Sequence, residues 1–103
     1  MRAALIGIVA ASAIMFVGNA QADAALATSS GCLNCHQVEV KTVGPALKAI
    51  AEKYAGQDGA SDFLAGQIKN GSNGVWGPIP MPPNAQVSDE NAKVLADFIL
   101  SLN

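Results

Sequence analysis

The two cysteines of the chain and its single histidine lie together in one five-residue stretch, Cys32-Leu33-Asn34-Cys35-His36. Two thiols at this spacing in a tight helical turn can each add across one of the two vinyl groups of a haem, which forms two thioether bonds. The histidine that follows is then held under the ring, where a ring nitrogen can bind the iron. The spacing therefore predicts one covalently attached haem c, with Cys32 and Cys35 as attachment sites and His36 as an iron ligand.

Three other interpretations of the cysteine pair are weaker. A thioredoxin-like redox pair requires a βαβ setting, and no window of this sequence alternates as a strand does. A structural zinc site requires four ligands, but the chain has no second pair of cysteines or histidines. A disulfide across so short a loop removes little entropy from the unfolded chain. The pattern favours haem attachment over all three.

Residues 1–22 have the three parts of a secretory signal peptide. A positive start at residues 1–2 precedes a nearly pure apolar run at 3–17, and Ala-Gln-Ala at 20–22 fits the small-x-small cleavage pattern. The alternative, an uncleaved membrane anchor, needs about 20 apolar residues, and this run is shorter. We therefore expect a cleaved signal peptide, a single domain formed by residues 23–103, and no membrane anchor after cleavage.

The hydrophobic content of the chain changes once this leader is set aside. The whole chain is 50% hydrophobic, but 16 of its 52 hydrophobic residues lie in residues 1–22. Of the 81 residues that remain, 36 are hydrophobic, which is an ordinary proportion for a globular domain. Only four of them are aromatic: Tyr54, Phe63, Trp76 and Phe98. A core with so few large side chains supplies little stability by itself, so we expect the haem to fill its centre.

The charge and the cysteine count exclude two classes of protein. Lys and Arg number 6 against 8 Asp and Glu, with no basic run, which excludes a nucleic-acid binder. Two cysteines three residues apart cannot form a disulfide framework. The lysines are scattered along the sequence, so charge alone does not name a partner.

Helical spacing of apolar residues and helix-stop signals predict an all-α chain. The expected helices are residues 23–30, 45–54, 61–70 and a last helix from residue 89. Gly31 should stop the first helix, and Ser61 and Ser88 should cap the third and the fourth. The clearest apolar stripe lies on the last helix, at Leu95, Phe98, Ile99 and Leu102. Residues 71–87, rich in glycine and proline, should form a loop.

A second iron ligand is suggested by Met81, the only methionine beyond the leader. An isolated methionine usually fills a core, but this one lies among four prolines in the run GPIPMPPN at residues 77–84. Proline fixes φ, so the loop is stiff and can hold a weak ligand near iron. Ligation by histidine and methionine raises the reduction potential, and a filled sixth position blocks oxygen or peroxide. Both effects favour electron transfer over catalysis.

Three more residues are candidates for supporting this site. The carbonyl of Pro45 can accept the free ring N–H of His36, although Gly-Pro here can also be only a turn before a helix. The indole N–H of Trp76 needs a partner if it is buried, and a haem propionate is the natural acceptor, although a core aromatic is the alternative. The amide of Asn84 can either donate to the Met81 sulfur or only shape the loop.

Residues 31–103 resemble the small bacterial class I cytochromes c of the 551/552 type. The run IKNGSNGVWGPIPMPPN at residues 68–84 is similar to that group nearly letter by letter, and Val-Gly-Pro at 43–45 and the cysteine motif agree with it. The resemblance implies the class I fold, in which four or five short helices wrap one haem and the first and last helices cross. It also implies the roles already considered for Cys32, Cys35, His36, Pro45, Trp76, Met81 and Asn84.

The function that the resemblance implies is that of a monomeric one-electron carrier in the bacterial periplasm, not an enzyme. Expected partners are a cytochrome bc-type complex or similar donor, and a nitrite reductase or terminal oxidase as acceptor, in respiration or denitrification. The alternatives are a small haem peroxidase, and a gas sensor in which a ligand displaces Met81. Both lack a spare distal histidine or arginine in this sequence.

Two further expectations concern the haem edge. Electrons should leave beside an apolar patch that suits brief docking, formed by Leu33, Val43, Pro78, Ile79, Pro80 and Pro82. Some members of the group carry an arginine in the third helix where this chain has Gln67. Glutamine cannot form a charge-assisted pair with a propionate. We therefore expect a higher propionate pKa than with arginine, and a reduction potential that varies with pH near neutrality.

Overall fold

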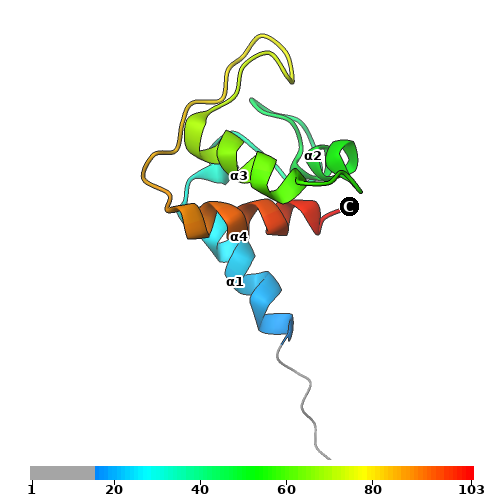
Figure 1. Ribbon diagram of the computed structural model, residues 1–103, viewed down its shortest axis with the longest axis vertical. Helices are drawn as coiled ribbons and strands as arrows, with labels where there is room; N and C mark the ends of the chain where they lie inside the picture. Colours follow the sequence, from blue (N-terminus) through cyan, green and yellow to red (C-terminus); the bar gives the residue numbers. More distant parts are fainter. Residues whose placement is uncertain (1–15) are drawn as a thin grey trace, which may run out of the picture.

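The computed structural model describes the backbone of residues 16–103 and the side chains from Asp23 onward. Four α-helices and one short 3-10 turn make up its regular structure (Figure 1). They are α1 (Phe16–Ser29), η1 (Cys32–Asn34), α2 (Leu47–Tyr54), α3 (Ala60–Asn70) and α4 (Asp89–Leu100). Over the described residues the only β pairing is an isolated antiparallel bridge between Ser72 and Met81. The expected all-α class is confirmed.

Helix α4 is the element around which the others pack. It contacts α1, α2 and α3, and Figure 1 shows it crossing α1, as the class I fold requires. Ala92 and Ala96 are completely buried, and such small side chains allow neighbouring helices to approach closely. Of the expected stripe, Leu95 and Ile99 are buried, while Phe98 and Leu102 are partly buried against the core.

Helix α1 differs from its expected bounds at one end only. Gly31, with φ +82°, follows the helix as the expected stop. The start, however, is at Phe16 and not at Asp23. The alanine-rich stretch around residue 22 offers helix-favouring residues and no stop signal, so the helix in this chain runs through the expected cleavage point. The rest of the expected signal peptide, residues 1–15, lies outside the described residues.

Two other helix starts also differ from expectation. Helix α2 begins at Leu47 and not at Pro45, because Ala46 is still extended with ψ 139°. Helix α3 begins at Ala60, after Gly59 in the left-handed conformation with φ +75°. The expected Ser61 cap is therefore wrong, and the Ser61 hydroxyl instead donates to the Asp97 carboxylate.

The start of α4 is as expected. The Ser88 hydroxyl oxygen accepts a hydrogen bond of 3.0 Å from the Asn91 N–H. Asp89 and Glu90 occupy the first turn, where the helix dipole favours negative charge. The loop after α3 ends where α4 begins, so the position of this helix start also fixes the end of the loop.

The buried core is small and mostly aliphatic. Tyr54 is its only buried aromatic residue in the described part of the chain, and its ring lies 5.4 Å from that of Phe63. Phe63 and Trp76 are both more than one third exposed. Among residues 16–103, no helix combines the length and the apolar character needed to cross a membrane.

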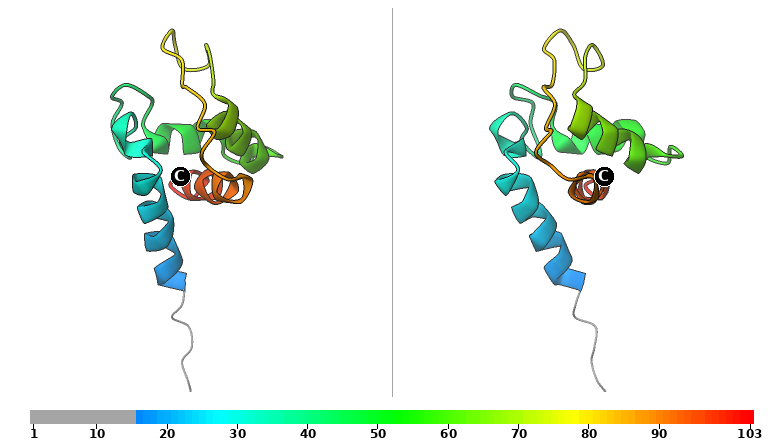
Figure 2. Two further views of the ribbon diagram at one scale, coloured as in Figure 1. Left: turned by 90° about the vertical axis from the view of Figure 1, so that its left-hand side faces the viewer. Right: turned by 60° about the vertical axis from the view of Figure 1, so that its left-hand side comes forward.

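Two loops rise on the same side of the helices (Figure 2). One is residues 35–46, between η1 and α2, and the other is residues 71–88, between α3 and α4. The second loop lies where the glycine- and proline-rich residues 71–87 predicted one, so that prediction is confirmed. The Ser72–Met81 bridge closes it at its base and leaves residues 73–80 as its tip. The space between these loops and the helices is the site considered next.

Candidate haem-binding site

An apolar cavity lies between the two loops and the core. Both cysteines, His36 and Met81 line it, although they come from segments far apart in the sequence. Its walls come from core side chains that belong to α2, α3 and α4, namely Leu47, Ile50, Tyr54, Leu64, Ile68, Leu95, Phe98 and Ile99. The cavity therefore joins a metal-binding donor set to an apolar wall, as a haem requires.

The cysteine motif forms a tight turn at one wall of this cavity. Gly31 starts the turn in the left-handed conformation, and the N–H groups of Cys35 and His36 both donate to the Cys32 carbonyl, at 3.2 and 3.0 Å. Both thiols are free, and Cys35 is exposed while Cys32 is half-buried. Burial raises the pKa of the Cys32 thiol, although a hydrogen bond with its own backbone opposes the rise. The turn presents two thiols and one imidazole to the same space.

The imidazole of His36 is held in one tautomer. Its Nδ1 lies 2.8 Å from the carbonyl oxygen of Pro45. A carbonyl oxygen can only accept, so Nδ1 carries the proton and Nε2 keeps its lone pair. The side chain is 9% exposed and lines the cavity. The hydrogen bond expected from the sequence is thus present, and it leaves Nε2 as the nitrogen that can bind a metal.

Gly44 allows the imidazole to take this position. A Cβ atom at Gly44 would lie 2.7 Å from His36 Cε1 and 2.9 Å from Nδ1, which is too close for any side chain. The Cys35 carbonyl holds the Gly44 backbone against the His36 ring, because it accepts hydrogen bonds from the Gly44 N–H at 2.8 Å and from the Thr42 hydroxyl at 2.7 Å. Sequence reasoning treated Gly44 only as part of a turn; its position before Pro45 was the available signal.

Met81 reaches the cavity from the second loop. Its backbone exchanges two hydrogen bonds with Ser72, of 2.8 Å from the Met81 N–H and 3.0 Å from the Ser72 N–H. Gly71 precedes this pair with φ +86°, and a Cβ there would lie 2.7 Å from the Met81 carbonyl oxygen. Prolines alone were expected to hold Met81, but Ser72 and Gly71 hold it as well.

Of the two roles considered for the Asn84 amide, the observed hydrogen bond is the one that shapes the loop. Its side-chain amide donates to the Ile68 carbonyl at 3.1 Å, and its backbone N–H donates to the same oxygen at 3.0 Å. Asn84 and Gln67 both line the cavity. The Asn84 amide thus ties the loop to the end of α3.

Trp76 lies at the edge of the cavity and is 38% exposed. The ammonium of Lys53 lies 5.5 Å from the Trp76 ring centre and 5.7 Å from that of Tyr54, which are cation–π distances. Lys53 thereby connects α2 to the tip of the loop. Sequence reasoning missed it, because no local pattern pairs residues 23 positions apart.

The expected apolar patch lies partly at the mouth of the cavity. Val43 and Ile79 are 53% and 62% exposed and line it together with the nearby prolines. Leu33 does not line the cavity; it is half-buried against the core. Val75, 44% exposed, takes part in the mouth although it was not expected there.

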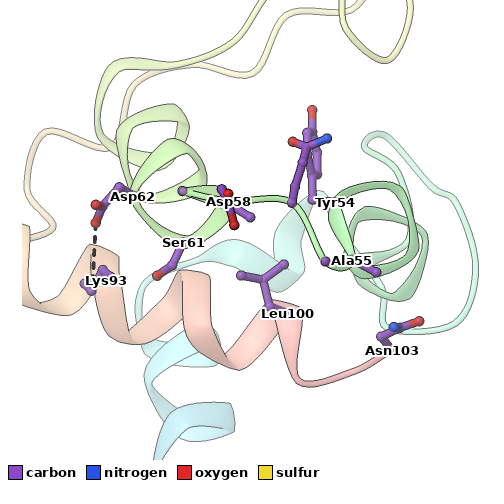
Figure 3. A pocket seen from close by; sticks show the side chains of 12 residues that line it. Tyr54, Ala55, Asp58, Ser61, Asp62, Lys93, Leu100 and Asn103 are labelled. Atoms are coloured by element: carbon purple, nitrogen blue, oxygen red, sulfur yellow. Dashed lines mark ion pairs between the residues drawn. The ribbon is translucent and has the colours of Figure 1, made fainter.

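A second hollow lies between the α2–α3 turn and the end of α4 (Figure 3). It has a polar rim that includes the Asp62–Lys93 ion pair at 3.3 Å, and no cysteine, histidine or methionine lines it. From Asp23 onward, where side chains are described, no three side chains of His, Cys, Asp or Glu lie close enough to hold a metal ion. The donor set of the first cavity is therefore the one that suits haem.

Fold and site together define a small single-haem protein of the c type, and comparison with known proteins agrees. The chain belongs to the cytochrome c family, since the Cytochrome c family model matches residues 20–103. It carries one covalently bound haem c, and its two cysteines, Cys32 and Cys35, have the spacing of a haem-attachment motif. Members of this family transfer electrons to and from redox partners.

Several relatives are similar over most of their length. Cytochrome c-552 of Nitrosomonas europaea is 62% identical over 102 residues, covering 99% of both chains. Cytochrome c-551 of Pseudomonas aeruginosa is 60% identical over 73 residues, covering 71% of this chain and 69% of that one. The crystal structure of wild-type Nitrosomonas europaea cytochrome c552 superposes with a TM-score of 0.76 at 64% identity, covering 78% of this chain and 99% of that chain. The class I fold is thereby confirmed.

Proposed function

We propose that this protein is a periplasmic one-electron carrier whose haem iron is bound by His36 and Met81. The observation that carries the proposal is their placement: both side chains line one apolar cavity, from loops on two sides of it. The haem iron supplies the one-electron couple between its ferric and ferrous states. The protein's own groups hold, orient and shield it.

Each residue of the site has a distinct part in this proposal. The sulfurs of Cys32 and Cys35 form the two thioether bonds, which keep the haem in register with His36. The Pro45 carbonyl supports ligation, because its hydrogen bond to Nδ1 orients the ring and increases the basicity of Nε2.

The opposite side of the haem depends on weaker groups. The Met81 thioether would hold the iron as a soft ligand, which would raise the potential and keep oxygen and peroxide from binding. Asn84 keeps a second amide N–H, beyond the one used at Ile68, that can donate to the Met81 sulfur. Trp76 lies at the edge of the cavity, where its indole N–H could donate to a haem propionate, and Lys53 lies over its ring.

Export is supported by the leader and by the solved relative. The crystallised c552 chain is matched over 99% of its length by 78% of this chain. Residues 23–103 make up about the same share of this chain, four fifths. Cleavage after Ala22 would start α1 at Asp23, and a carboxylate in the first turn suits the helix dipole. We therefore assign residues 1–22 as a signal peptide and residues 23–103 as the periplasmic cytochrome domain.

Electron exchange is assigned to the mouth of the cavity. Val43, Val75 and Ile79 are exposed there, and a small apolar surface suits short-lived complexes. The proposed donor is a cytochrome bc-type complex or similar, and the proposed acceptor is a nitrite reductase or a terminal oxidase. The protein acts as a monomer in both encounters.

A redox titration of the purified holoprotein tests the function. We expect a reversible one-electron Nernst curve, and negligible turnover of hydrogen peroxide. Steady peroxide turnover would favour the small-peroxidase alternative, and reversible binding of carbon monoxide or nitric oxide with release of Met81 would favour the gas sensor. Either result would contradict the carrier assignment.

A further inference from the structure

The last turn of α3 and Ser72, two residues beyond the helix, make three separate connections to the segment that carries Met81. These connections start at Ser72, Ile68 and Lys69. Figure 1 shows the returning arm of the loop passing the end of α3 on its way to α4. The end of a helix leaves backbone groups without helical partners, so it offers donors and acceptors to a neighbouring segment.

The first two connections use such backbone groups. In a continued helix the Ser72 N–H would donate to the Ile68 carbonyl, four residues earlier. Here the Ser72 N–H donates to the Met81 carbonyl, and the Ile68 carbonyl accepts from both the backbone and the side chain of Asn84. The helix end is thus satisfied by the residues on and just after the proposed ligand.

The third connection is made by a side chain. The Lys69 ammonium donates to the Val87 carbonyl at 2.8 Å and lies 2.9 Å from the Asp89 carboxylate. The Lys69 side chain is 27% exposed, less than the lysines of the other ion pairs, Lys48 at 46% and Lys93 at 48%. A charge-assisted bond that is partly shielded from water is stronger than one at the open surface.

We propose that Lys69 is a positioning residue for Met81. It fixes the far end of the ligand-bearing segment, where Val87 is buried and α4 begins, while Ser72 fixes the near end. A segment held at both ends keeps the thioether near the iron, so Met81 resists replacement by other ligands. This inference rests on the proposed function, because it takes Met81 as the sixth ligand.

Displacement of Met81 by imidazole measures the effect. Ferric holoprotein is titrated with imidazole, and the loss of the near-infrared methionine-to-iron charge-transfer band is followed. We expect Lys69→Met to raise the apparent imidazole affinity about fivefold, and Lys69→Arg to restore most of the difference. Asp89→Asn, at a position with a 96% exposed side chain, keeps the Val87 contact and should give a smaller rise.

Lys93→Met is the matched control. It removes the same charge and also breaks a lysine–aspartate pair between α3 and α4, but it does not touch the loop. We expect its imidazole affinity to stay within about twofold of the parent. The inference is overturned if Lys69→Met and Lys93→Met change the affinity equally, or if Lys69→Met lowers only the urea midpoint.

Failure of the inference and failure of the proposed function give different results. A parent protein without the methionine-to-iron band would overturn Met81 ligation itself. A parent protein with the band, and an imidazole affinity that Lys69→Met leaves unchanged, would overturn only the part assigned to Lys69.

Discussion

The two sides of the haem cavity hold the two proposed iron ligands by different means. On the histidine side, the His36 ring is buried, bonded to a carbonyl nine residues away and packed directly on Gly44. On the methionine side, Met81 is only partly buried, and its backbone rather than its side chain is fixed, through two hydrogen bonds with Ser72 just beyond α3. The stronger ligand is oriented at its ring, whereas the weaker ligand depends on a segment held from a distance.

The largest expected effect removes both sides at once. Cys32→Ser with Cys35→Ser prevents covalent attachment, and the remaining core has Tyr54 as its only buried aromatic in the described residues. We expect the haem-free chain to lose its near-UV circular dichroism and its cooperative melting, because a small aliphatic core supplies little net stability. Cooperative melting of this variant would show that the polypeptide does not need the haem to fold.

The next effect breaks the histidine side alone. In Gly44→Ala the new Cβ meets the His36 ring, and we expect the free energy of unfolding of the holoprotein to fall by about 2 kcal/mol. Chemical denaturation followed by haem absorption measures it. Gly66→Ala is the control, since a Cβ at this α3 position meets nothing within 4 Å. Equal effects of the two substitutions would contradict the close packing of Gly44 on the ring.

A smaller effect breaks the methionine side. Gly71→Ala meets the Met81 carbonyl and also strains a backbone with φ +86° and ψ 174°, at a cost of about 1–3 kcal/mol for the strain alone. We expect a weaker methionine-to-iron band and easier displacement of Met81 by imidazole. Gly56→Ala carries the similar φ of +73° with nothing within 4 Å, so it reports the strain without the contact. If both variants leave the band unchanged, Gly71 does not position the ligand.

The smallest expected effect concerns the haem propionates and neither of the two proposed ligands. A propionate that ionises near neutrality stabilises the ferric state, so the potential of the parent protein should fall as pH rises through that pKa. Gln67→Arg should lower the propionate pKa and flatten the profile near neutrality, because Gln67 lines the cavity. Potentials measured from about pH 5 to 9 give both profiles, with Gln57→Arg, at an exposed turn, as control. Coincident profiles for Gln67→Arg and the parent would refute the expectation.

Much of the histidine side could be predicted from sequence because its contacts are local. Cys32, Cys35, His36 and Pro45 lie within one short stretch, so spacing alone brings them together. Apart from the start of α1, the helix bounds were also predicted to within a few residues, and the two serine caps show what decided the outcome. Ser88 caps α4 as expected, whereas Ser61 does not cap α3, since the left-handed Gly59 lets that helix begin earlier and Ser61 turns to Asp97.

The methionine side was less predictable because its contacts are distant in sequence. The prolines around Met81 were enough to predict it as a ligand, but the contacts of Lys69 with Val87 and of Asn84 with Ile68 span 18 and 16 residues. No periodicity or motif records such pairs; they follow from how α3 and the loop meet. The start of α1 was missed for another reason, since an alanine-rich run carries no signal for where a helix begins.

The absorption spectrum of the ferric holoprotein tests the central claim, that His36 and Met81 bind the two faces of one haem iron. The account predicts a low-spin spectrum with a near-infrared methionine-to-iron band. In Met81→Ala this band should vanish, and the reduction potential should fall strongly while the covalent haem remains. A high-spin spectrum of the parent protein, or a band that survives in Met81→Ala, would contradict the account.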